Sequence, residues 1–320
     1  MFDWGTFAEN PFRFSSANIH SIEISDVKYE VFLLMIKYIY TGSLLKSDIA
    51  PEMAIPLFVA QNQYLLDSSM ALSVIKDNVS EQNVLDILSL CLEFSFSEIS
   101  EHCHKYLLSN IETNYVNMRS LFREKRDNGT LEGDTLYLNL VEASPIWEMV
   151  INNDDLEYKS QWVSSVVAFS SEYTGWPATN VIGASNTFPE YGDLKTAWAP
   201  KAAKGASEFL ELKFPDEMFI AKVEVYETYN PGGLVKITGK SKSAGDLVMF
   251  EGESQAHILP PVSRIFSVPI NFDVSLKHQF DYLRFDIDTT KNGSWYEIDA
   301  IKLSGFVKKG NKGFLSGLFK

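Results

Sequence analysis

Two carboxylates near the end of the chain are the first residues whose type and spacing suggest chemistry. Glu297 and Asp299 alternate with Ile298 and Ala300, so in a strand both carboxylates would lie on one face. Such a pair can bind calcium when further oxygen ligands join it, or cleave a glycosidic bond when the two groups flank that bond. Neighbours on one strand face do not flank a bond, which argues against glycoside hydrolysis. A structural calcium ion stays open, because no further oxygen ligand can be assigned from the sequence.

The run His102-Cys103-His104 also contains residue types that bind metals. Consecutive helical positions point about 100° apart and cannot converge on one zinc ion. We therefore expect a buried cysteine between two surface histidines. The sequence contains no P-loop, no GxGxxG motif and no nucleophile–base constellation, so we predict that the chain is not an enzyme and needs no cofactor.

Composition narrows the classes of partner. The chain has 320 residues, a hydrophobic share of 45% and a net charge of −14. The first 115 residues contain 6 Lys and Arg against 15 Asp and Glu, which disfavours binding to nucleic acid. Only two cysteines fit a reducing compartment, so we expect a cytoplasmic protein that can also be nuclear. No long uncharged apolar run and no signal-peptide pattern occur, which predicts no stable membrane insertion.

The stretch from Ile22 to Leu44 shows the clearest order of elements in the N-terminal half. Isoleucines at alternate positions, 22 and 24, predict a short strand, and Asp26 is expected to cap the helix that follows. Gly42 predicts a left-handed C-cap for that helix. Its apolar face recurs at three- and four-residue steps and consists of Val31, Leu34, Met35, Tyr38 and Ile39.

The residue order I-x-D-V, then V-F, then Y-I-Y-T-G resembles the middle of a BTB/POZ domain. Some BTB domains bind a cullin scaffold of the third type through a hydrophobic-x-Glu motif. The resemblance therefore implies cullin binding by Phe7 and Glu9, with Asp26 as an added polar contact, and an exposed aromatic ring suits such a hot spot. The alternative is that Phe7 belongs to the core at a helix end and Glu9 is solvated. Met1 falls about halfway through such a domain. The usual dimer helix would then be absent, so homodimerisation stays open.

Further helical patterns follow. Residues 51–70 resemble a helix of the BTB domain, and residues 79–109 predict a helical pair similar to the BACK extension. Tyr137–Val141 predicts a short strand. The predicted organisation is the C-terminal part of a BTB domain (1–75), a BACK-like extension (76–115), a connector (116–160), a β-sandwich (161–306) and a flexible basic tail (307–320).

From Trp162 onward the hydrophobic period changes to two, and turns containing Pro and Gly separate the segments. The predicted strands are 209–214, 219–227, 234–239, 264–270, 282–288 and 296–306. The segments VVAFSSEY, SNTFPEYGD, AWAP, EFLELKF, VEVYETYNPGG and WYEIDAIKLSG resemble, in this order, a discoidin-type, galactose-binding-like jelly roll similar to that of an F-box/leucine-rich-repeat protein. We therefore predict a multidomain fold, with an all-α (partly α/β) BTB/BACK-like half followed by an all-β jelly-roll sandwich.

Jelly rolls of this type hold ligands in loops at one end, so the resemblance implies ligand-binding loops. Aromatic rings beside Asn and Asp suit the recognition of a sugar or a peptide. For Trp198 and Trp295 the alternative is a role in core or loop packing. The candidate loop residues are Glu172, Tyr173, Trp176, Asn186, Tyr191, Asp193, Trp198, Tyr229, Asn230 and Trp295.

These patterns favour a non-catalytic protein-interaction adaptor. The BTB resemblance implies a substrate-recruiting subunit of a cullin–RING ubiquitin ligase, in which the jelly roll holds an unknown protein or glycan target. Protein ubiquitination itself would then be catalysed by the partner enzymes. The alternatives are a BTB-type scaffold unconnected to ubiquitin, and a glycan- or calcium-binding module.

Overall fold

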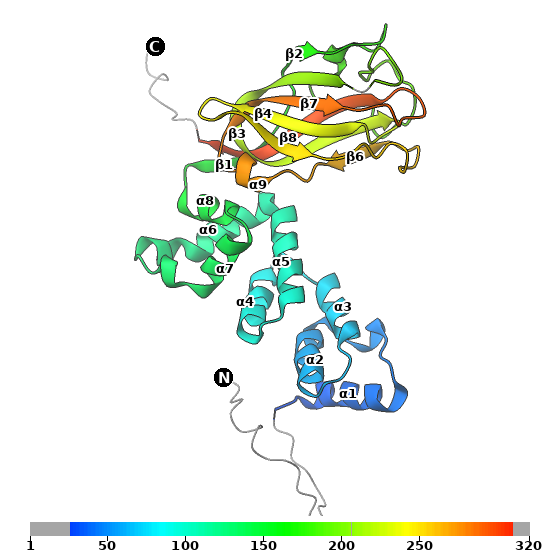
Figure 1. The fold of residues 1–320 in the computed structure, drawn as a ribbon. Coiled ribbons are helices and arrows are strands. Elements are labelled where there is room, and N and C mark those ends of the chain that lie inside the picture. Colours follow the sequence, from blue (N-terminus) through cyan, green and yellow to red (C-terminus); the bar gives the residue numbers. More distant parts are fainter. Residues whose placement is uncertain (1–25, 206, 310–320) are drawn as a thin grey trace, which may run out of the picture. The chain divides into compact units, whose positions relative to one another are not determined.

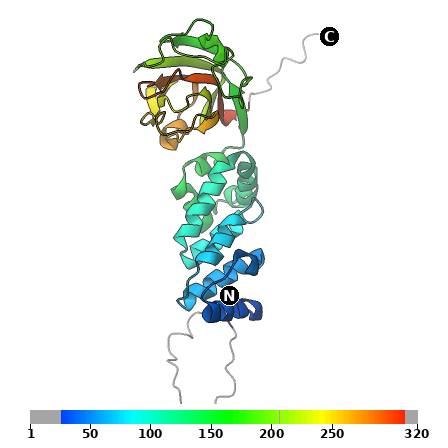
Figure 2. The same cartoon turned by 90° about the vertical axis from the view of Figure 1, so that its right-hand side faces the viewer.

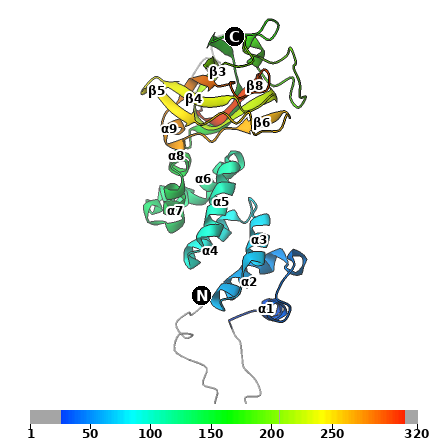
Figure 3. The same cartoon turned by 45° about the vertical axis from the view of Figure 1, so that its right-hand side comes forward.

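The computed structural model describes residues 26–205 and 207–309, which fall into two compact units divided between Ile111 and Glu112. The described part of the first unit is helical. Within it α2 packs on α1 and α3, and α5 packs on α3 and α4 (Figure 3). Its elements are α1 (Tyr29–Thr41), η2 (Lys46–Asp48), α2 (Pro51–Gln63), α3 (Ser69–Asp77), α4 (Val84–Phe94) and α5 (Ser97–Ser109).

Helix α1 confirms the predicted C-terminal signal and corrects the N-terminal one. Gly42 adopts φ 75° and its N–H donates to the carbonyl of Tyr38, as a left-handed C-cap should. At the other end the N-cap is Lys28, whose side chain makes no capping bond, so the capping role predicted for Asp26 is wrong. Val31, Leu34 and Met35 are buried as expected, but Ile39 is 57% exposed. The apolar stripe of this helix is therefore only partly covered.

The second unit begins with the helices α6 (Ile111–Asp127), α7 (Thr135–Ala143) and α8 (Ile146–Asn152), together with η3 (Leu131–Gly133). The short strand predicted for Tyr137–Val141 is wrong, because this stretch lies in α7. Asp134 accepts a hydrogen bond from the backbone N–H of Tyr137 at 2.8 Å and so caps the helix.

Arg119 on α6 joins these helices to the start of the β-sandwich. Its Nε donates to the carbonyl of Val150 at 2.6 Å and its Nη1 to the carbonyl of Leu156 at 2.8 Å. The guanidinium lies over the ring of Tyr115, which in turn makes an edge-on contact with Phe306 at 5.4 Å between centroids. Burial lowers the pKa of Arg119, although the group keeps its charge because arginine starts from a very high pKa. Helix and sandwich are thus joined by buried polar bonds and aromatic packing.

The sandwich consists of antiparallel strands in two sheets (Figure 1). Sheet A pairs β1, β8, the second half of β3, and β6. Sheet B pairs β2, the first half of β3, β7, β4 and β5. The elements are β1 (Leu156–Trp162), β2 (Ser165–Phe169), η4 (Ala178–Val181), β3 (Glu208–Tyr229), β4 (Leu234–Ser241), β5 (Gly245–Glu251), β6 (Arg264–Ser267), α9 (Phe272–Ser275), β7 (Phe280–Ile287) and β8 (Glu297–Lys308).

Strand β3 turns the corner between the two sheets. Two separate strands were predicted for residues 209–227, but they form one bent strand whose pairing with β7 is interrupted between Lys213 and Met218. Pro215 lies in that interruption, where its missing N–H removes no ladder bond. The two sheets face each other (Figure 2) and enclose one apolar core. Leu210, Val223 and Phe285 are fully buried in it.

The predicted fold class is confirmed: a helical N-terminal half is followed by an antiparallel jelly-roll sandwich. The alternating segments predicted β4, β6, β7 and β8, whereas β1, β2 and β5 were not predicted. Across the described residues, no helix is long and apolar enough to cross a membrane. Strand β8 includes Val307 and Lys308, and residues 310–320 of the predicted tail lie outside the described part.

Candidate ligand-binding site at the loop end of the sandwich

Three aromatic rings meet in the loops that precede η4 and β8. The ring of Tyr173 lies 5.4 Å from that of Trp176 and 5.2 Å from that of Trp295, measured between centroids. Gly175 adopts φ 96° between the first two, which closes a tight turn in which the Trp176 N–H donates to the Tyr173 carbonyl. We call Tyr173, Trp176 and Trp295 the aromatic cluster. Tyr173 is 40% exposed, so the cluster reaches the surface.

A second aromatic pair, Tyr191 and Tyr229, has its ring centroids 5.4 Å apart. Asn230 connects this pair to the aromatic cluster. Its Oδ1 accepts from the hydroxyl of Tyr191 at 3.5 Å, and its Nδ2 donates to the carbonyl of Trp295 at 2.8 Å. Asn292 donates to the carbonyl of Asn230 at 2.7 Å. Hydrogen bonds therefore hold three loops together at this end of the sandwich.

Glu297, the first residue of β8, is fully buried beneath these loops. It pairs with Tyr229 across the β3–β8 ladder. Burial raises the pKa of Glu297 to about 8; the N–H of Leu194 and the indole of Trp176 oppose the rise, and the Asp193 carboxylate adds to it. At neutral pH the carboxyl group is therefore mostly protonated and can donate a hydrogen bond as well as accept one.

Several buried polar atoms at this end have no hydrogen-bond partner among the described residues. They include Nε1 of Trp176, Nε1 of Trp295 and Oε1 of Glu297. The Trp176 indole acts on the pKa of Glu297 without reaching full hydrogen-bond geometry. Each such atom costs on the order of 1–3 kcal/mol, and costs of this kind concentrate at functional sites.

The exposed side chains around the aromatic cluster carry opposite charges. Asp193 and Lys195 are both exposed, and the Nζ of Lys195 lies 5.5 Å from the centroid of the Trp176 ring. An aromatic surface with an acceptor and a donor at the same end of the sandwich suits a ligand that has an apolar face and hydroxyl or amide groups.

The predicted loop residues thus separate into two groups. Tyr173, Trp176, Tyr191, Asp193, Tyr229, Asn230 and Trp295 come together at one end. Trp198 is fully buried, and its Nε1 donates to the carbonyl of Ser171, which makes it a core residue as its alternative interpretation required. Glu172 accepts from the N–H of Ala178 at 2.8 Å and supports its own loop.

Asn186 belongs to a different arrangement around Asp299. The Asp299 carboxylate accepts from the N–H groups of Asn186, Thr187 and Phe188 at 3.0–3.3 Å and from the hydroxyl of Ser185. Asp299 therefore holds the loop that contains Asn186, whereas Glu297 is hydrogen-bonded to a different loop.

This arrangement bears on the structural calcium ion that the sequence left open. The oxygens of Asp299 are occupied by four donors, and those of Glu297 belong to a group that is mostly protonated at neutral pH. Within the described ranges, no three His, Cys, Asp or Glu side chains are grouped to hold a metal ion. Glu297 and Asp299 together do not fit a calcium site.

The cullin-binding residues predicted in the N-terminal half are only partly described. Phe7 and Glu9 lie outside the described residues. Asp26 accepts a hydrogen bond from Nε2 of Gln63 at 3.2 Å. Cys103 is buried as predicted, and the His102 ring contacts the carbonyl of Lys76 at 3.1 Å.

Two residues of the loop end were missed from the sequence. Lys195 gave no signal, because a lone lysine in a loop is common. Asn292 gave a weak sequence signal, because it lies in a Lys-Asn-Gly turn just before Trp295. Their contacts depend on loops that only the folded sandwich brings together.

Comparison with known proteins gives one family match. The family model "PAPPA: Pappalysin-1, SD scarf domain, C-terminal" matches residues 152–312, half of the chain. Among curated proteins of Arabidopsis thaliana, the "ARM repeat protein interacting with ABF2" is 30% identical over 114 residues, which is 35% of this chain and 14% of that protein. The "Armadillo BTB Arabidopsis protein 1" is 29% identical over 99 residues, 30% of this chain and 13% of that protein. The chain thus spans about a seventh of the length of these relatives.

Solved structures resemble this chain over slightly less than half of its length. Reduced XRCC1 bound to the DNA pol beta catalytic domain is 15% identical, with 46% of this chain and 99% of that chain covered and a TM-score of 0.37. The CBM32 of AlyQ in complex with 4,5-unsaturated mannuronic acid is 15% identical, with coverages of 45% and 96% and a TM-score of 0.29. CpGH89CBM32-4 of Clostridium perfringens, in complex with glcNAc-alpha-1,4-galactose, is 14% identical, with coverages of 45% and 94% and a TM-score of 0.32.

Proposed function

The chain belongs to the family of the pappalysin-1 C-terminal SD scarf domain, and from this premise we propose that it is a non-catalytic binding adaptor whose sandwich holds a carbohydrate ligand at its loop end. The observation that carries the proposal is the aromatic cluster with its polar neighbours. Tyr173 is 40% exposed, the Nζ of Lys195 lies 5.5 Å from the centroid of the Trp176 ring, and the Asp193 carboxylate interacts with the Glu297 carboxyl group. A sugar presents apolar C–H faces that stack on such rings and hydroxyl groups that bond to such side chains.

The buried carboxyl group of Glu297 supports this proposal from below the surface. A neutral acid at this position spares the loops the repulsion that a second full negative charge beside Asp193 would cause. The Asp193 carboxylate can then accept a hydrogen bond from a hydroxyl group of the ligand. The arrangement favours a neutral or weakly polar ligand over a strongly charged one.

Replacing Trp176 by alanine should weaken ligand binding by about tenfold or more, because a ring at the centre of a contact accounts for much of its binding energy. The measurement is retention of the full chain on an array of immobilised oligosaccharides, followed by titration of each hit. Tyr173→Ala should act in the same direction. The matched control is Trp162→Ala, since Trp162 lies on β1 and contacts Tyr226 instead of the loop end.

Two results would count against a carbohydrate ligand. One is an array on which the full chain retains no oligosaccharide. The other is equal weakening by Trp176→Ala and Trp162→Ala, which would locate binding elsewhere or show a general loss of structure. Unfolding curves of both variants distinguish these causes.

For the N-terminal half we propose the finer role of docking a cullin scaffold, so that the chain recruits a target to a ubiquitin ligase. The motif V-F…Y-I-Y-T-G supports this docking role; its residues form α1 and the left-handed cap at Gly42. The name of one partial relative includes BTB, which also supports it, although the match covers only 13% of that protein. Without a ligase connection the same half would be an interaction scaffold.

Phe7→Ala should cost more than about 1 kcal/mol of binding to the N-terminal domain of the third-type cullin, because a hot-spot ring contributes at least this much. Isothermal calorimetry with the full chain measures it, with Glu9→Ala as the second variant. Glu30→Ala, at an exposed position of α1, serves as the control. Unchanged affinity in the Phe7 variant would remove the docking assignment while leaving the carbohydrate proposal untouched.

A further inference from the structure

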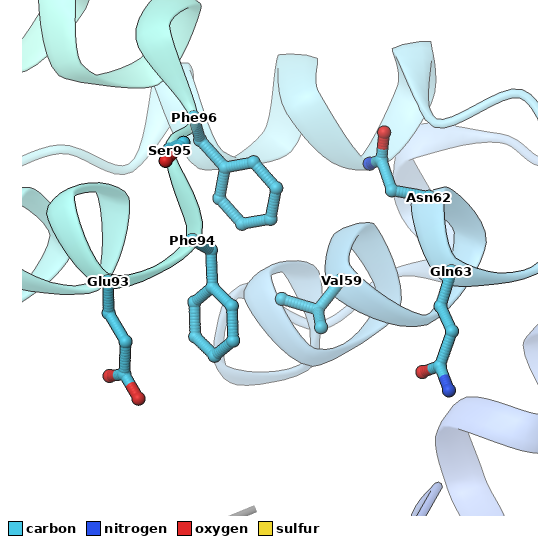
Figure 4. Close-up of a pocket in the computed structure, with 7 residues that line it drawn as sticks. All are labelled: Val59, Asn62, Gln63, Glu93, Phe94, Ser95 and Phe96. Atoms are coloured by element: carbon cyan, nitrogen blue, oxygen red, sulfur yellow. The ribbon is translucent and has the colours of Figure 1, made fainter. Parts of the chain in front are cut away.

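The first unit contains an apolar pocket that the proposed function does not use. It has a volume of about 450 Å³ and lies between the C-terminal half of α2 and the turn that joins α4 to α5 (Figure 4). Its lining residues are Val59, Asn62, Gln63, Glu93, Phe94, Ser95 and Phe96.

The turn between α4 and α5 supplies the aromatic wall of the pocket. Ser95 adopts φ 60°, which ends α4 and places Phe94 and Phe96 on the same side. The rings of Phe94 and Phe96 are stacked with centroids 5.7 Å apart (Figure 4). The ring of Phe96 also meets that of Phe58 edge-on at 4.9 Å. This wall suits an aromatic side chain, because rings pack favourably in stacked and edge-on arrangements.

The first described residue, Asp26, is hydrogen-bonded to a residue of this pocket. Asp26 accepts a hydrogen bond at 3.2 Å from Nε2 of Gln63, which lines the pocket. Burial and the nearby Asp26 carboxylate both raise the pKa of Tyr64, the residue after Gln63. The first described residue is therefore linked to the lining of the pocket by one hydrogen bond.

The composition of residues 1–25 matches the pocket. Five of these 25 residues are aromatic, and Arg13, between Phe12 and Phe14, is their only Lys or Arg. Glu93 is exposed and lines the pocket, so its carboxylate can reach a cation at the opening. Eleven residues separate Phe14 from Asp26, and the twelve steps from one to the other can span up to about 40 Å, so the segment can reach the opening.

We propose that the pocket is occupied by the Phe12-Arg13-Phe14 segment of the same chain. In an extended segment the two phenylalanines share one face and point toward Phe94 and Phe96. Arg13 then points to the rim, where its guanidinium pairs with Glu93. The occupant is neither a second copy nor a separate partner protein. This inference is independent of the ligand of the sandwich and of cullin binding.

A disulfide cross-link in the full chain tests the proposal. Ser15→Cys places a thiol next to Phe14, and Ser95→Cys places one at the pocket. We expect a cross-link within one chain under mild oxidation. The control pair joins Ser15→Cys to Ser109→Cys, at the exposed end of α5, and should react at least tenfold more slowly. The native cysteines are buried, so the unsubstituted chain gives the background. Yields equal to the control pair, or covalent dimers instead of an internal link, would overturn the proposal.

Variants of the occupant add a second readout to the cross-linking rate. Phe12→Ala combined with Phe14→Ala should lower it by about tenfold, as the loss of a hot spot does. Arg13→Glu alone or Glu93→Arg alone should lower it by about 2- to 5-fold, and the double charge reversal should restore it. An unchanged rate in both single charge variants would overturn the pairing of Arg13 with Glu93.

Discussion

Glu297→Gln should make the chain more stable than the unsubstituted chain above pH 8 and leave the two equally stable near pH 4. The reason is the pKa of Glu297, which burial raises to about 8 from 4.5. Between these values the folded state binds a proton that the unfolded state has released. The unsubstituted chain therefore loses stability as the pH rises from about 4.5 to 8, and a glutamine, which cannot ionise, removes this loss.

The size of the effect follows from the shift. A rise of this magnitude corresponds to an upper limit of about 5 kcal/mol, at about 1.4 kcal/mol per pKa unit. Urea unfolding of both proteins at several pH values between 4 and 9 measures this effect as a difference in unfolding free energy, which cancels the titration of other groups.

Asp193→Asn is an informative second variant, because the Asp193 carboxylate contributes to the raised pKa of Glu297. In that variant the folded-state pKa of Glu297 should be lower, so the loss of stability should end at a lower pH and be smaller, while it still begins near the unfolded-state pKa. Parallel pH curves for the unsubstituted chain and Glu297→Gln would show that this carboxyl group is not buried as described.

Gly305→Ala should destabilise the sandwich by about 3 kcal/mol or more, because the new methyl group has no room. A Cβ at this position would lie 2.0 Å from the carbonyl oxygen of Phe219 and 3.0 Å from the N of Ala221. Both atoms belong to β3, which pairs with β8 here, and β1 pairs with β8 at Lys159 on the other side. Neither neighbouring strand can move without breaking a ladder that also positions Glu297.

The matched control is Gly293→Ala, in the loop before β8. A Cβ there meets no atom within 4 Å and its backbone is not left-handed, so stability should change by no more than about 0.5 kcal/mol. Urea midpoints of the two variants give the comparison. Equal midpoints would contradict the close approach of β3 and β8. Because Gly293 lies two residues before Trp295, binding by this control also reports on the loop itself.

The strand pattern could be predicted because its signal is local. Alternation of apolar and polar residues marked β4, β6, β7 and β8; exposure alternates along β4, β6 and β7, whereas almost every residue of β8 is buried. β1 and β5 lack a clear alternation, and they pair at the edges of their sheets, where burial is incomplete. The corner in β3 was predicted as a break between two strands, because local turn residues do not reveal whether a strand ends or only bends.

The candidate site was predictable as a set of loops but not as an arrangement. Trp198 and Trp176 look alike in the sequence, yet one is fully buried in the core and the other lines the loop end. Glu297 and Asp299 alternate as one face requires, but they bond to different loops. Which loop reaches which carboxylate depends on pairings more than 100 residues apart along the chain.

By itself the sequence determined the helical half, the antiparallel sandwich and the left-handed cap at Gly42, because these features depend on residue periodicity and on backbone conformations that few residues adopt. Only the tertiary structure decided that Tyr173, Trp176 and Trp295 form one cluster and that Asp26 bonds to Gln63 instead of capping α1. It also decided that burial keeps the Glu297 carboxyl mostly protonated. The physical reason is that contacts and pKa values arise from neighbours in space, and the strand register and the packing of loops select those neighbours.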